Sequence, residues 1–475
     1  MRKGAGHREG IAYLDISLPV EDIHKILDFT VSGGGEFAEL FLESKLSHSV
    51  FCENSRVERI SSGKDSGFGL RIMASGRTVY GYSNITRMDE ISGLARKLLD
   101  MIGSGGGTSP EVLDATRVAA SNPEIQVDSI SAEEKVGLVL SADRAARDAG
   151  REIAQVQVSY LDSRQTVGIF NSNGDSVEDE RRQLVFSVRA VASEGPILQT
   201  ALRTVGGSAG FGVLDGMDPV ELAADAGEGA IRTLKARPAP AGKMTVVLAS
   251  LAGGTMVHEA IGHGLEGDAA EKNLSIYSGK VGEMVASPHI TVIDDATLEG
   301  KRGSYLYDDE GVPARRSVLV ENGILRGYLL DRRTAARLGT DSTGNGRRES
   351  FRYRPIVRMS NTMIAPGGHD PAQIINSVGK GLYVVRMGGG QVDTSSGDFV
   401  FKVDEAYIIE GGRVGEPVRG AVLIGNGPAV LKGIDMVGND LGFDIGTCGK
   451  DGQNVPVADA QPTLRIPSIT VGGHV

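Results

Sequence analysis

The segment from Gly253 to Asp268 restricts the fold of this chain more than any other. It reads Gly-Gly-Thr-Met-Val-His-Glu-Ala-Ile-Gly-His-Gly-Leu-Glu-Gly-Asp and holds two of the eight histidines, His258 and His263. Residues of a regular helix advance by about 100° each, so side chains five apart point about 140° away from each other. One wide π-type turn takes up the extra residue and returns both side chains to one face. The spacing therefore predicts a helix that is bulged, or that ends early, at this pair.

The same segment has two chemical interpretations. Neutral imidazoles are good zinc ligands, and a carboxylate beside a ligand, here Glu259, can take a proton from metal-bound water. The pattern resembles the His-Glu-x-x-His helix of zinc proteases with one residue added. The alternative is the solvated polar face of an ordinary helix. On the metal interpretation, Gly262 and Gly264 are expected to help the backbone leave regular geometry.

A third ligand candidate lies far along the chain. Cys448 stands between Gly446 and Gly449 in a polar stretch, which we interpret as an exposed loop. A lone cysteine is often a small buried hydrophobe. A thiolate is nevertheless an excellent zinc ligand, and two histidines with one cysteine leave the fourth position of zinc open, as in catalytic sites.

Composition excludes several classes of protein. The net charge of -11, from 50 basic and 61 acidic side chains, argues against a dedicated nucleic-acid binder. Two cysteines in 475 residues favour a reducing compartment. We find no signal peptide, and no apolar run approaches the roughly 20 residues of a membrane span. These features predict a soluble, cytoplasmic protein.

Periodicity predicts an α+β protein in two parts. The first, residues 1–237, is an N-terminal α/β domain with a possible subdomain break near 103–131. The second, residues 238–475, begins at the Pro-rich segment 238–243 and is a largely antiparallel β domain with an inserted metal-binding helix. Among the strands expected in the first part are Ser49–Ile60, Ile153–Leu161 and Gln165–Asn171.

Several motifs together resemble the TldD/PmbA family of metalloproteases, historically called modulators of DNA gyrase. They run through the whole second half of the chain, with a looser match around Gly67–Arg71 in the first half. They are His258–Asp268, Asp308–Gly311, Gly344–Ser350, Arg358–Thr362, Gly388–Asp393, Met436–Asp440 and Cys448–Gln453. The run Val457–Pro462 departs from the more glycine-rich family pattern.

The resemblance implies one zinc ion held by His258, His263 and Cys448, with Glu259 as the general base that cleaves peptide bonds. It also implies short or unfolded polypeptides as substrates. Because the full metal motif is present, the chain resembles the catalytic type of subunit. Family members commonly pair with a PmbA/TldE-type subunit that lacks the metal motif, so the expected partner is such a paralogue, or a second copy of the chain.

Other residues are weaker candidates for the site. An oxyanion needs a cationic or amide donor, and Arg358, Asn361 and Lys450 are the candidates, although Arg and Asn in a strand are more often structural. The acidic run Asp308–Glu310 is interpreted either as carboxylates that orient a ligand histidine or as an acidic turn.

Two further functions stay open from the sequence. The chain could be a non-catalytic binding or assembly subunit, against which the intact metal motif counts. It could also be a zinc amidohydrolase that acts on a small amide, since the ligands do not define the substrate.

Overall fold

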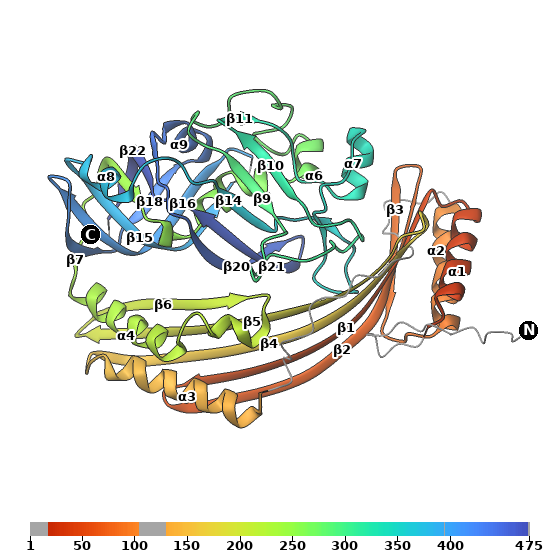
Figure 1. The fold of residues 1–475 in the computed structure, drawn as a ribbon, viewed down its shortest axis with the longest axis horizontal. Helices are drawn as coiled ribbons and strands as arrows, with labels where there is room; N and C mark the ends of the chain where they lie inside the picture. Colours follow the sequence, from red (N-terminus) through yellow and green to blue (C-terminus); the bar gives the residue numbers. More distant parts are fainter. Residues whose placement is uncertain (1–17, 104–129, 394, 474–475) are drawn as a thin grey trace, which may run out of the picture.

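The computed structural model describes residues 18–103, 130–393 and 395–473 of the chain. The predicted subdomain break near 103–131 lies almost entirely outside the described residues. Long antiparallel sheets and a smaller number of helices make up the described part, which confirms the α+β class (Figure 1). None of its helices is long and apolar enough to cross a membrane.

The N-terminal part is one long, curved sheet with helices on one face (Figure 1). All neighbouring strands are antiparallel, in the order β3-β2-β1-β4-β5-β6. The strands are β1 (Phe37–Glu53), β2 (Arg56–Ala74), β3 (Arg77–Ser83), β4 (Ile153–Asn171), β5 (Ser176–Glu194) and β6 (Ile197–Gly207). The helices are α1 (Val20–Ser32), α2 (Met88–Gly103), α3 (Ala132–Asp148) and α4 (Pro219–Lys235), with a 3-10 turn η2 (Gly210–Leu214).

The two faces of this sheet follow from the two-residue period of a strand. In β4, Val158 and Tyr160 pack under α3 and α4. Val167 and Ile169 have the opposite parity and pack against Phe351 of the C-terminal half. The sheet therefore lies between its helices and the C-terminal half, as Figure 1 shows.

The strand predictions were wrong in two places, in one by spanning a turn and in the other by dividing a continuous strand. The predicted strand Ser49–Ile60 contains a turn at Asn54 and Ser55, which have φ of 50° and 63°. Ile153–Leu161 and Gln165–Asn171 are one strand, β4, with no break between them. Polar side chains interrupt the apolar alternation there: Asp162 pairs with Lys135 of α3 on one face, and Ser163 and Gln165 line a cavity against the C-terminal half on the other.

The C-terminal half contains two main sheets around one large core. The first has the order β11-β10-β9-β14-β21-β20, and the second has the order β15-β8-β22-β18-β16-β17-β7. Because β15 also pairs with β16, five strands of the second sheet close into a ring. The pairs β14–β21, β15–β8 and β17–β7 are parallel, and the other pairs of these two sheets are antiparallel.

The bounds of these elements are as follows. The first sheet consists of β9 (Val292–Asp295), β10 (Arg316–Glu321), β11 (Ile324–Leu325), β14 (Asn361–Ile364), β20 (Gly442–Lys450) and β21 (Gln453–Gln461). The second consists of β7 (Arg237–Pro238), β8 (Gly242–Leu248), β15 (Lys380–Val392), β16 (Asp398–Glu410), β17 (Arg413–Arg419), β18 (Val422–Asn426) and β22 (Leu464–Gly472), with β19 (Met436–Val437) beside β22. A separate pair joins β12 (Gly346–Arg347) and β13 (Ile356–Val357).

The helical segments of this half are short. They are η3 (Ser250–Ala252), α5 (Thr255–Val257), η4 (His258–Gly262), η5 (His263–Leu265), α6 (Gly267–Glu271), α7 (Arg332–Leu338), α8 (Pro371–Asn376) and α9 (Gly427–Gly433). The segment from η3 to α6 follows β8 and packs into the large core through Met256, Ile261 and Leu265. Whether the chain divides into independent domains at residue 238 stays a prediction.

Candidate metal centre

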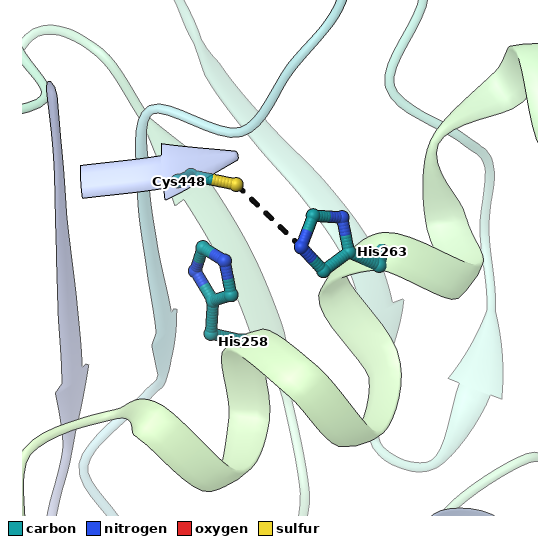
Figure 2. A group of neighbouring side chains, drawn as sticks. All are labelled: His258, His263 and Cys448. Carbon is teal, nitrogen blue, oxygen red and sulfur yellow. Dashed lines mark hydrogen bonds between the residues drawn. The ribbon is translucent and has the colours of Figure 1, made fainter. Parts of the chain in front are cut away.

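The helix at the histidine pair contains the predicted π-type turn. In η4 the N–H of His263 donates to the carbonyl of His258, a bond that spans five residues instead of four. The two imidazole rings consequently lie on one side of the segment, with centroids 4.9 Å apart (Figure 2). The sequence prediction of a bulged helix is confirmed.

Gly262 was expected to help the backbone leave regular helical geometry, and this explanation was wrong. Its backbone is helical, with φ of -55° and ψ of -57°, so any residue could adopt it. A Cβ at Gly262 would lie 2.3 Å from the sulfur of Met359, and one at Gly264 would lie 2.7 Å from the ring of Tyr277. Both positions therefore need glycine because the helix packs closely against its neighbours.

Cys448 lies beside the histidines, as Figure 2 shows. Its Sγ is 3.5 Å from Nε2 of His263, and the three donor atoms of Cys448, His258 and His263 lie within 4.8 Å of one another. The prediction of an exposed loop was wrong, because Cys448 belongs to β20, pairs with Val455 of β21 and is 5% exposed. The glycines beside it are strand residues.

The charge state of Cys448 suits a metal ligand. Burial alone would raise the pKa of the thiol, but hydrogen bonds from His258 and His263 outweigh burial and lower it to about 5. A thiolate is the ligating form of cysteine. Two imidazoles and a thiolate that converge in a buried space fit zinc, which binds nitrogen and sulfur donors tetrahedrally.

Each of the two candidate ligand histidines contacts a carboxylate through Nδ1. Nδ1 of His258 lies 2.8 Å from Oδ1 of Asp459, and Nδ1 of His263 lies 2.9 Å from Oε2 of Glu266. These contacts leave Nε2 of both rings as the atom available to a metal, the usual arrangement in histidine–metal sites. Burial would lower the pKa of His263, but Glu266 outweighs it and raises that pKa to about 10.

These carboxylates are not the ones proposed from the sequence. Of the two interpretations of Asp308–Glu310, the contacts do not support the one in which these carboxylates orient a candidate ligand histidine. Asp308 accepts N–H bonds from residues 310, 312 and 346, Asp309 pairs with Arg181, and Glu310 pairs with Arg71. The alternative interpretation, a structural acidic turn, agrees with these contacts.

Of the two carboxylate–histidine contacts that the sequence analysis missed, only the one between Glu266 and His263 could have been found from the sequence. Glu266 follows His263 by three residues, a spacing that brings side chains together on a helix. Asp459 is 201 residues from His258, and nothing local in the sequence links the two.

Glu259 follows His258 in the chain, is partly buried, and feels the charges of His258, His263 and Cys448. Burial raises the pKa of its carboxyl, and the charges of His258 and His263 act against that rise. The general-base role of Glu259 stays a prediction.

The candidate oxyanion donors are already engaged within the protein. Arg358 is fully buried and donates to the carbonyl oxygens of Cys448 and Gln453. The amide nitrogen of Asn361 donates to the Asp295 carbonyl and to the Ser304 hydroxyl. An oxyanion role for either residue stays a prediction, while Arg358 clearly positions the backbone of Cys448.

Lys450 also has a structural role. Its Nζ donates to Asp268 at 2.7 Å, to Glu266 at 3.1 Å and to the Val357 carbonyl at 3.1 Å. Burial would raise the pKa of Glu266, but Lys450 and His263 outweigh it and lower that pKa to about 2. Lys450 thus keeps ionised the carboxylate that orients His263.

Comparison with known sequences identifies the family of the chain. Sequence models described as PmbA/TldA metallopeptidase domain 1, central domain and C-terminal domain match residues 38–102, 125–234 and 241–473. The chain belongs to this metallopeptidase family, which confirms the resemblance seen in its motifs.

Individual relatives agree with this assignment. The chain is 37% identical over 470 residues to a metalloprotease TldD homolog from Haemophilus influenzae, covering 96% of this chain and 97% of the relative. It is 38% identical over 444 residues to a metalloprotease from Methanothermobacter thermautotrophicus, covering 92% and 96%. A zinc metalloprotease TldD homolog from Saccharolobus solfataricus is 27% identical over 453 residues, covering 93% and 98%.

Solved structures share the fold. TldE from Thermococcus kodakarensis superposes with a TM-score of 0.77 at 18% identity, covering 95% of this chain and 100% of that chain. A Thermotoga maritima protein described as a modulator of a DNA gyrase gives a TM-score of 0.77 at 20% identity, covering 95% and 99%. At these identities the likeness establishes the fold alone.

Proposed function

We propose that the chain is a zinc-dependent peptidase in which His258, His263 and Cys448 hold one zinc ion and Glu259 is the general base. One observation carries the proposal: His258, His263 and Cys448, from two distant segments, bring three side chains of the kinds that bind zinc within 4.8 Å of one another. When bound there, zinc supplies Lewis acidity, which polarises a carbonyl and makes water more acidic.

Other residues of the chain orient the two histidines and transfer the proton. Asp459 and Glu266 hold the two imidazoles with Nε2 turned inward. The Glu259 carboxylate accepts a proton from the attacking water and delivers it to the leaving nitrogen. Positioned groups of this kind contribute roughly 10²–10⁴-fold to the rate.

The proposed substrates are peptide bonds in short or unfolded polypeptides, in the cytoplasm. Support comes from the family and from relatives named as metalloproteases. The proposed partner is a PmbA/TldE-type subunit or a second copy of the chain, supported by the fold shared with TldE. The net charge of -11 supports the absence of direct nucleic-acid binding.

Substitution of Glu259 by Gln tests the catalytic assignment. The variant is expected to bind as much zinc as the wild type, measured by mass spectrometry, and to lose cleavage of an unfolded polypeptide such as casein. Glu299→Gln, an exposed glutamate in a turn, is the matched control and should keep both properties. Cleavage at the wild-type rate by Glu259→Gln would disprove the general-base role.

The same assay separates the two other candidate functions. If the zinc-loaded wild type cleaves no polypeptide, alone or with a PmbA/TldE-type subunit, but hydrolyses small amides, it is an amidohydrolase. If it cleaves neither, the binding or assembly role is favoured.

A further inference from the structure

A cavity of about 270 Å³ lies between the N-terminal sheet and the C-terminal half. The sheet contributes side chains of β1, β4 and β5, including Lys45, Gln165 and Gln183. The C-terminal half contributes Arg302 and Arg347, together with parts of β20 and β21. Both halves of the molecule would therefore contact any ligand bound there.

The lining of this cavity carries an excess of positive charge. Five cationic and two acidic side chains line it: Lys45, Arg181, Arg302, Arg347 and Arg348, against Asp309 and Glu349. Arg181 forms an ion pair with Asp309, and Arg348 forms one with the buried Glu39. Among the described lining residues, this leaves three cations, Lys45, Arg302 and Arg347, and one further carboxylate, Glu349. The Oε2 atom of Glu349 accepts the N–H of Asn454.

Arg302 and Arg347 bind neutral acceptors only. Arg302 donates to the Gly446 carbonyl at 3.1 Å and to the side chain of Gln183 at 3.0 Å. Arg347 donates to the carbonyls of Met359 and Pro456 at 2.7 and 2.8 Å. No carboxylate of the described residues lies within ion-pairing distance of either guanidinium.

Arg302 is partly buried, Arg347 is buried, and neither forms an ion pair, which is unfavourable because each cation is costly to desolvate and repels the other. Asp309 attracts Arg347 only from a longer distance. Burial, and then the charge of Arg347, lower the pKa of Arg302 to about 10. The pKa of Arg347, which is 6% exposed, is also lowered, chiefly by burial. An anion between them would remove this cost.

We propose that this cavity binds a small multivalent oxyanion, carrying phosphate or carboxylate groups, between Arg302 and Arg347. Planar guanidinium groups match both kinds of oxyanion with paired N–H donors. Lys45 adds an ammonium, and the amides of Gln165 and Gln183 add neutral donors from the N-terminal sheet. The bound anion would join that sheet to the strand that carries Cys448.

Anion titrations of the zinc-loaded full chain test the proposal. Inorganic phosphate and succinate are titrated separately by calorimetry and by thermal unfolding, with chloride at equal ionic strength as reference. Saturable binding of either anion and a rise in the unfolding temperature above that in chloride are expected. Tighter binding of inorganic phosphate would identify the ligand as a phosphate compound, and tighter binding of succinate would identify it as a carboxylate compound.

Variants locate the bound anion. Arg302→Gln should weaken binding by at least about tenfold, the loss expected for one charged hydrogen-bond partner. Lys45→Gln, which breaks no ion pair, should weaken it less, and Arg413→Gln, an exposed arginine on β17, should leave it unchanged. Cys448→Ser should also keep binding, since the anion does not sit at the metal.

Three results would overturn the proposal. They are the absence of saturable binding, the same stabilisation by chloride, and wild-type affinity in both Arg302→Gln and Lys45→Gln. Loss of binding in a Cys448→Ser variant that thermal unfolding shows to be folded would place the anion at the metal centre and would equally refute the cavity site.

Discussion

Asp459 gives the sharpest test of how the metal centre is built. Its carboxylate lies 2.8 Å from Nδ1 of His258, and both side chains are largely buried. Asp459→Asn keeps an oxygen that can accept the Nδ1 hydrogen but removes the negative charge. Asp459→Ala removes the partner altogether, so His258 loses both its orientation and its bond.

The expected loss follows from the contact. Removing a group that orients a metal ligand typically lowers metal affinity about 10–100-fold, which corresponds to about 1.4–2.7 kcal/mol. A hydrogen bond to a charged group contributes about 1.5–3 kcal/mol, which covers nearly the same range. Because Asn retains the bond without the charge, we expect about tenfold weaker zinc binding for Asp459→Asn and about a hundredfold for Asp459→Ala.

Competition with a chromophoric zinc chelator measures both affinities. Asp440→Asn is the matched control, since its carboxylate accepts hydrogen bonds from the N–H and hydroxyl of Thr463 rather than from a ligand histidine. Thermal unfolding establishes that the variants are folded. Wild-type zinc affinity in folded Asp459→Ala would refute the role assigned to this carboxylate.

Three further predictions concern the same structure. Cys448→Ser should lose bound zinc in mass spectrometry, whereas Cys52→Ser, whose thiol is buried in the helix-covered core, should retain it. Gly262→Ala should lower the free energy of unfolding by about 1–3 kcal/mol in denaturant titrations, because the new Cβ would lie 2.3 Å from a buried methionine sulfur. Gly137→Ala, in open space on α3, should not destabilise the protein and should gain up to about 1 kcal/mol of helix propensity. Glu39→Gln should lower the free energy of unfolding by about 3–5 kcal/mol in the same assay, since it breaks the fully buried ion pair with Arg348 that joins the two halves.

The sequence predicted the histidine helix well because the relevant geometry is local. A spacing of five residues between His258 and His263 has few helical solutions, and the π-type turn is the one found. The resemblance to the family supplied Cys448 as the third ligand. Its place on a strand was not predicted, because glycines and polar residues favour loops when no pairing partner is visible.

The features that the sequence did not predict depend on contacts between segments far apart in the chain. The pairing of Asp459 with His258 joins residues 201 positions apart. Strand β4 was divided because its polar middle makes a buried ion pair with α3 on one face and lines a cavity on the other, and periodicity cannot distinguish such polar residues from a solvent-exposed turn. The cavity lined by Arg302 and Arg347 likewise exists only where the two halves meet.

The hairpin of β20 and β21 links the two sites. Cys448 pairs with Val455, and Asp459 lies four residues beyond Val455 on the same strand, so all three point to one face. That face carries the thiolate and the carboxylate that orients His258.

The intervening residues point to the opposite face of the hairpin. Thr447 pairs with Pro456, and both line the cavity with the two arginines. A register shift of one residue would exchange the two faces, and would move Cys448 out of the metal site and Thr447 out of the cavity wall. The turn at Asp451 and Gly452, both with positive φ, helps to fix that register. Zinc binding and anion binding therefore depend on the same strand pairing, although no side chain is shared between them.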